Sequence, residues 1–190
     1  MIHIAVFKVT GISPLLQNNP ASMSPLEQGK TVVNKKIPTP EEEAAAKVYK
    51  NGNGTFYILS ESFRSAIIGK GGAASGRKIG KRTAISSCSA GLFTIEPRLE
   101  LLNPETGKPL KKYEIDTRRA VIGSAGVLRS RPMFPKWMVK VPFEIDDDWV
   151  TVQIALDLLQ IAGKVSGVGD FRPQRKGSFG RFTAELETST

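Results

Sequence analysis

The residues of this chain that could do chemistry gather in a glycine-rich segment near its C-terminal end. The segment reads VSGVGDFRPQRKGSFGRF and spans residues 165–182. Its four cationic side chains before the last phenylalanine would neutralise phosphate groups, and its two internal phenylalanines would stack on bases. These six residues are Phe171, Arg172, Arg175, Lys176, Phe179 and Arg181. The chemistry that they predict is noncovalent binding of a nucleic acid.

The same segment also has a purely structural interpretation. Its four glycines allow the backbone to pass close to another segment as readily as to a ligand. Phe171 and Phe179 would then be buried in the core, and Asp170 would bond to local backbone or pair with Arg172. Both interpretations stay open at the level of the sequence.

Two further segments combine glycine with positive charge. Residues 69–82 read GKGGAASGRKIGKR, and we expect a cationic finger that orders on a phosphate backbone, or else a solvated flexible loop. The spacing of Gly71 and Gly76 imitates a phosphate-binding loop, but the required Gly-Lys-Ser/Thr is missing, so nucleotide hydrolysis is excluded. Residues 118–131 are predicted to be another basic loop. The candidate contacts in the two segments are Arg77, Lys78, Lys81, Arg82, Arg118, Arg119, Arg129 and Arg131.

Side chains suited to catalysis are scarce. The single histidine, His3, excludes a zinc site built from several histidines, and the single cysteine, Cys88, permits no internal disulfide. The acidic runs 41–43 and 146–148 stand where helices are expected to begin, so we interpret them as helix caps. We therefore expect no enzymatic activity, no metal site and no cofactor.

The charge of the chain is unevenly distributed. The 190 residues contain 27 Lys and Arg against 18 Asp and Glu, a net charge of +9. Residues 61–140 carry +10 and residues 164–182 carry +4, whereas residues 141–163 carry −5. This clustering predicts one cationic face whose usual partner is a polyanion, most often nucleic acid.

The elements that must position these residues follow from hydrophobic periodicity and capping signals. We expect strands at 2–10, 55–59, 92–102, 111–117, 139–145 and 178–186, and helices beginning at 40, 60 and 149. Pro142 marks its strand as an edge or a bulge. This order predicts an α+β fold: a ferredoxin-like antiparallel sheet, as in RNA-recognition modules, with helices on one face and long inserted loops. We expect a single domain over 1–190, with flexible insertions at about 12–38, 69–90 and 118–135. Such folds bind nucleic acid on the open face of the sheet.

Three stretches of the chain make it similar to a known family. They are GISPLLQNNPASM (residues 11–23), IGKRT (79–83) and GVGDFRPQRKGSFGRF (167–182). The last resembles the glycine-rich loop near the end of proteins of the RAMP superfamily, which bind guide RNA in CRISPR effector complexes. The three together resemble phage and bacterial proteins that share them. The resemblance implies an RNA-recognition-like core, binding of single-stranded nucleic acid and assembly along the strand.

The sequence thus predicts a non-enzymatic protein that binds single-stranded DNA or RNA largely without regard to sequence and forms homo-oligomers or filaments. One alternative is a subunit of a CRISPR-like ribonucleoprotein complex. Another is a RAMP-type endoribonuclease that uses Asp170 or Asp116 with a metal. In an assembly, the acidic stretch 146–157 of one copy would meet the basic loops of the next. No signal-peptide pattern and no long apolar run occurs, so we expect a cytoplasmic protein, in a bacterium or a phage-infected host cell, that does not enter the membrane.

Overall fold

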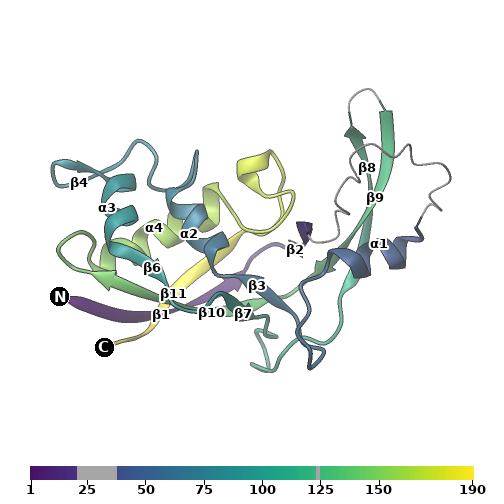
Figure 1. The fold of residues 1–190 in the computed structure, drawn as a ribbon, viewed down its shortest axis with the longest axis horizontal. Helices are drawn as coiled ribbons and strands as arrows, with labels where there is room; N and C mark the ends of the chain where they lie inside the picture. Colours follow the sequence, from purple (N-terminus) through teal and green to yellow (C-terminus); the bar gives the residue numbers. More distant parts are fainter. Residues whose placement is uncertain (21–37, 123–124) are drawn as a thin grey trace, which may run out of the picture.

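The computed structural model describes residues 1–20, 38–122 and 125–190, and it has a mixed α+β fold with antiparallel sheets (Figure 1). The α+β class is therefore confirmed. The main sheet has four strands in the spatial order β11-β1-β10-β6. Their bounds are β1 (Ile2–Gly11), β6 (Leu92–Thr94), β10 (Met138–Asp146) and β11 (Phe182–Ser189).

Alternation of side chains places one face of this sheet in the core. Ala5, Phe7 and Val9 of β1 are fully buried, whereas Ile4 on the opposite face is 48% exposed. Pro142 lies in β10, an inner strand of the sheet, but at Pro142 itself β10 is paired only with β1. The pairing with β6 stops at Phe143, so the missing N–H of the proline lies just beyond that ladder.

Three helices cover the buried face of the main sheet (Figure 1): α2 (Glu61–Ile68), α3 (Ala84–Gly91) and α4 (Val152–Val165). Phe63 of α2 packs edge-on against Phe182 of β11, with ring centroids 5.6 Å apart. The helix α4 starts three residues later than predicted, because Thr151 and not the acidic run is its N-cap. Asp146 instead accepts the N–H of Asp148, which makes a local turn before the helix.

A second, three-stranded sheet extends away from the chain termini (Figure 1). Its order is β2-β9-β8, with bounds β2 (Leu15–Leu16), β8 (Glu114–Ile122) and β9 (Ala125–Phe134). The prediction of an irregular insertion over 118–135 is therefore wrong. Glycine and arginine suggested a loop, but nine consecutive residue pairs join β8 to β9 in an antiparallel ladder.

The helix α1 (Pro40–Lys47) covers the free edge of β9. Its N-cap is Thr39, which forms a full capping box with Glu42 of the acidic run. One turn on, the Glu43 carboxylate accepts the N–H of Ser130 at 2.8 Å, and Lys47 Nζ donates to the Ser130 carbonyl at 3.0 Å. The two side chains thus take the place of a neighbouring strand, which protects an edge that would otherwise pair with other chains.

This edge contact should make stability depend on pH. Burial acts to raise the pKa of Glu43, but hydrogen bonds from Lys47, Ser130 and Arg129 and the charge of Lys47 hold it below its ordinary value of 4.5. A carboxylate with a lowered pKa stabilises the fold above its unfolded pKa, and this contribution is lost as the pH falls through the folded pKa. We expect Glu43→Gln to cost about 1–2 kcal/mol at pH 7 and less at pH 4, as measured by urea unfolding. The control is Glu41→Gln, an exposed acid of the same turn, and equal losses at both pH values would contradict the assignment.

Short elements complete the fold. The strands β3 (Tyr57–Leu59) and β7 (Arg98–Glu100) pair, as do β4 (Lys78–Ile79) and β5 (Arg82–Thr83), and η2 (Pro173–Arg175) is one turn of 3-10 helix. The predicted insertion 69–90 therefore contains a small hairpin and α3. Of the predicted insertion 12–38, residues 21–37 lie outside the described residues.

In the described part of the chain, no helix is long and apolar enough to cross a membrane.

Candidate nucleic-acid interface

The glycine loop, residues 167–181, is held against the segment that follows β1. Asp170 N–H donates to the Leu16 carbonyl, and Gly180 N–H donates to the Pro14 carbonyl, both at 2.8 Å. Ile12 N–H donates to the carbonyl of Arg181 at 2.9 Å. Two of the three stretches that carry the family resemblance, one near each end of the chain, therefore lie side by side.

Two glycines of the loop are required by close backbone contacts. A Cβ placed on Gly177 would lie 1.6 Å from the Phe171 carbonyl oxygen. A Cβ on Gly180 would lie 1.8 Å from the Val168 oxygen, and Gly180 also has a φ of +66°. The glycines thus allow parts of the loop to pack closely against one another, as the structural interpretation predicted.

Within this tightly packed loop, Phe171 has a strained backbone conformation. Its φ is +52°, in the left-handed region that bulky residues rarely adopt, and its side chain is 40% exposed. The guanidinium carbon of Arg131 lies 5.7 Å from the ring centroid. Strained backbone persists only where the surroundings enforce it, and it concentrates at functional sites. The ring of Phe171 is therefore fixed on the surface, next to the guanidinium of Arg131.

Phe179 has a different environment from its neighbour in sequence. It is only 7% exposed, and the guanidinium of Arg118 lies over its ring at 4.6 Å. The prediction that both phenylalanines stack on bases is therefore wrong for Phe179, which fills the space between the loop and β8. Its structural interpretation holds instead.

Asp170 joins the loop to the hairpin of β8 and β9. Its Oδ2 accepts from Arg131 Nε at 2.5 Å, and its Oδ1 accepts the N–H of Phe171 at 2.9 Å. The bond to local backbone was predicted, but the ion-pair partner is Arg131 rather than Arg172. Arg131 is 9% exposed, and its Nη1 is buried without a hydrogen-bond partner among the described residues.

Arg172 is a structural part of the loop as well as a cation. Its Nη1 donates to the Gly169 carbonyl at 2.8 Å, and its Nε donates to Gln174 Oε1 at 3.0 Å. Burial and the nearby charge of Arg175 lower the pKa of Arg172, while Asp170 acts in the opposite direction. Arg175, Lys176 and Arg181 are exposed around it. The loop therefore has one half-buried and three exposed cations within ten residues.

The hairpin adds arginines to this surface from one of its two faces. The register places Arg118 opposite Arg129 and Asp116 opposite Arg131, so these side chains share a face. Arg118 and Arg131 contact Phe179 and Phe171, which places this face against the glycine loop. Arg119 alternates to the other face, so it does not join the group.

The remaining predicted contacts lie elsewhere. The hairpin β4–β5 stands beside α3, at the opposite end of the molecule from β8 and β9 (Figure 1). There Arg82 lies over the ring of Trp149 at 4.2 Å, and Arg77 Nε donates to the Ala73 carbonyl. Lys78 and Lys81 are exposed. The predicted single cationic face is therefore divided, with Arg77, Lys78, Lys81 and Arg82 apart from the glycine loop.

The open face of the main sheet does not gather the predicted contacts. None of the fourteen belongs to its four strands. On β1 and β10, Lys8 and Lys140 face each other, but Lys140 pairs with Glu187 at 2.7 Å. The exposed aromatic of this sheet among the described residues is Phe93, which is 42% exposed. The expectation of binding on the open face is thus unsupported by the distribution of charge.

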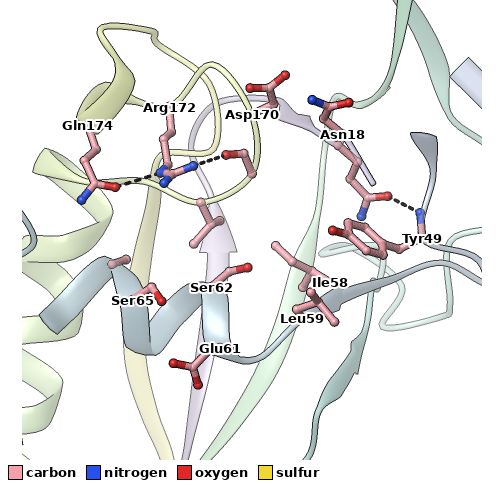
Figure 2. Close-up of a pocket in the computed structure, with 14 residues that line it drawn as sticks. Asn18, Tyr49, Ile58, Leu59, Glu61, Ser62, Ser65, Asp170, Arg172 and Gln174 are labelled. Atoms are coloured by element: carbon pink, nitrogen blue, oxygen red, sulfur yellow. Dashed lines mark hydrogen bonds between the residues drawn. The ribbon is translucent and has the colours of Figure 1, made fainter. Parts of the chain in front are cut away.

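A pocket of about 380 Å³ opens between α2, β3 and the glycine loop (Figure 2). Sequence reasoning missed most of the residues that line it. The signal was present for Gln17 and Gln174, since each is an amide inside one of the resemblance stretches. Gln17 accepts from the Tyr49 N–H and donates to the Tyr57 carbonyl, and Gln174 donates to the Lys70 carbonyl. The two amides tie the pocket walls to their neighbours.

The two carboxylates considered for a metal both have arginine partners. Asp116 accepts from Arg118 Nε at 2.8 and 2.9 Å, and Asp170 pairs with Arg131. In the residues that the structure describes, no group of three or more His, Cys, Asp or Glu side chains could hold a metal ion. Burial raises the pKa of the Cys88 thiol to about 11, opposed by Arg64, so this cysteine is a thiol at neutral pH.

No protein-family model and no curated protein matches this chain.

Proposed function

We propose that this protein binds single-stranded nucleic acid on the surface formed by the glycine loop and the face of the β8–β9 hairpin that carries Arg118, Arg129 and Arg131. The observation that carries the proposal is Phe171, an exposed ring fixed in a strained backbone conformation among cations. An unpaired base can stack on such a ring, whereas the bases of a duplex are already stacked on one another. The cations beside it would then neutralise the phosphates on either side of the stacked base.

The fold supports this proposal. We infer that the main sheet is ferredoxin-like, because its strands, numbered along the chain, lie in the order 4-1-3-2, and helices connect the first to the second and the third to the fourth. RNA-recognition modules use this topology. Here the proposed contact surface lies at one end of the sheet, where the glycine loop precedes β11, and not on its open face. The RAMP-like resemblance belongs to the same proposal, since two of its three stretches build this surface.

The chemistry expected at this surface is binding and not catalysis. Arginine and lysine contact phosphates of any sequence, and every base has a face that can stack. Affinity should therefore depend weakly on sequence and strongly on salt.

A salt titration tests the proposal. Fluorescence anisotropy of labelled dT20 and rU20 should show binding at about 50 mM salt that weakens steeply by 200 mM. With three to five phosphates neutralised, log K should fall with log salt at a slope of about −2 to −4, since a single strand gives about −0.7 per phosphate. A duplex of equal length, the control, should bind more weakly. Absence of binding to either single strand at about 50 mM salt would refute the proposal.

A further inference from the structure

The pocket beside the glycine loop lies next to Phe171, the residue proposed to stack on a base. Asp170 lines the pocket, and the next residue along the chain is Phe171. The pocket volume of about 380 Å³ is near the lower end of the roughly 300–1,000 Å³ found for small-molecule sites. It suits one small group better than a stretch of peptide.

The inner wall of the pocket is apolar with hydroxyl groups. Ile58 and Val168 are buried and form apolar parts of the lining. Figure 2 shows Tyr49 from the β3 side and Ser62 from α2 with their hydroxyl groups directed toward the space between them. Burial, together with Tyr57, raises the pKa of Tyr49, so its phenol stays protonated and can donate a hydrogen bond at neutral pH. Asn18 adds an amide at the exposed rim.

Two of the three charged groups of the lining have ion-pair partners within the protein. Asp170 pairs with Arg131, and Glu61 pairs with Arg64 at 3.4 Å. Arg172 is bound to Gly169 and Gln174, as described above. The pocket therefore suits an uncharged ligand with a flat apolar face and hydrogen-bonding groups at its edge, which is the chemical description of a nucleobase.

We propose that this pocket receives one unpaired base of the bound strand, next to the base that stacks on Phe171. The inference rests on the proposed function, since the strand delivers the base. Tyr49 and Ser62 would hydrogen-bond to its edge, and Ile58 and Val168 would contact its face. The protein would thus bind two bases of the strand, one stacked on Phe171 outside the pocket and one inserted into the pocket.

The test fills the pocket without touching the phosphate contacts. In Ser62→Leu the larger side chain occupies the space, and Ser65→Leu is a second variant from the same helix. The control is Ser86→Leu, an exposed serine in the first turn of α3 outside the pocket. Circular dichroism and thermal unfolding establish that each variant is folded. We expect Ser62→Leu to weaken dT20 binding about tenfold, as for the loss of one base contact, with an unchanged salt slope because no phosphate contact is lost.

A second readout separates this inference from the proposed function. Saturation-transfer NMR with thymidine, which has no phosphate, should show contact with the wild-type protein and with Ser86→Leu but not with Ser62→Leu. If folded Ser62→Leu and Ser65→Leu bind dT20 and thymidine as the wild type does, the base pocket is refuted while strand binding stands. If the wild type binds neither dT20 nor rU20, the proposed function is refuted; the base pocket then falls too unless thymidine still binds in a Ser62-dependent way.

Discussion

Replacing Asp170 by alanine should lower the free energy of unfolding by about 3 kcal/mol, because it leaves the buried guanidinium of Arg131 without its charge partner. Arg131 is 9% exposed, and one of its nitrogens already lacks a hydrogen-bond partner among the described residues. Asp170 also accepts the N–H of Phe171, so the same change releases the strained residue. Urea unfolding at pH 7 measures the loss.

The matched control for this prediction is Asp116→Ala. Asp116 also pairs with an arginine of the hairpin, but the Arg118 side chain is 47% exposed. The Arg118 guanidinium stays in contact with water when its partner is removed, so the loss should be at most about 1 kcal/mol and this variant should be nearly as stable as the wild type. In a double-mutant cycle, Arg131→Met should recover part of the stability lost in Asp170→Ala. Equal effects of the two aspartate variants, or no coupling between Asp170 and Arg131, would contradict the role assigned to the pair.

The same variants decide the endoribonuclease alternative. With Asp170 engaged by Arg131, we expect the wild-type protein to leave labelled RNA intact in the presence of magnesium. Cleavage by the wild type that is lost in a folded Asp170→Ala protein would assign this carboxylate to catalysis instead.

The second large effect is expected at Phe171. Phe171→Ala should weaken binding of dT20 and rU20 by about 5- to 150-fold, the range that corresponds to the 1–3 kcal/mol of a stacked base. The salt slope should not change, because the ring contacts bases and not phosphates. Alanine keeps the Cβ, so the backbone strain at φ +52° is unchanged. Because the Phe171 ring is 40% exposed, its removal should cost the fold little stability.

Local patterns were sufficient to predict several elements of the fold. The strand at 2–10 and the helices beginning at 40 and 60 were expected from short-range patterns, and the structure confirms the three elements as β1, α1 and α2. The start of α4 was misplaced because Thr151 competes with the acidic run for the N-cap, and both residue types are good caps. Such errors shift a boundary without changing the architecture.

The hairpin of β8 and β9 could not be predicted in the same way. Its arginines and glycines are typical of loops, but its strands are held by pairing across the hairpin and, at the edge of β9, by α1. Glu43 and Ser130 are 87 residues apart in sequence, and no local pattern connects them. Long-range contacts of this kind decide whether such a segment is a strand or a loop.

The candidate site was predicted in composition but not in arrangement. The sequence identifies the glycine loop, but Phe171 and Phe179 both lie among glycines and basic residues along the chain. Only the folded loop shows that Phe171 is exposed and Phe179 is buried. The partner of Asp170 lies 39 residues away on a strand that was expected to be a loop. The pocket is also a product of the fold, since its walls come from three separate parts of the chain.

The most direct test of strand binding at the glycine loop compares Phe171→Ala with Phe93→Ala in the anisotropy titration of dT20 at about 50 mM salt. The two rings are matched: Phe93 is 42% exposed with Arg64 5.6 Å from its centroid, and Phe171 is 40% exposed with Arg131 at 5.7 Å. Phe93 belongs to the main sheet, and Phe171 belongs to the glycine loop. We predict at least about fivefold weaker binding for Phe171→Ala and wild-type affinity for Phe93→Ala. Wild-type affinity for Phe171→Ala, or a loss confined to Phe93→Ala, would contradict binding at the glycine loop.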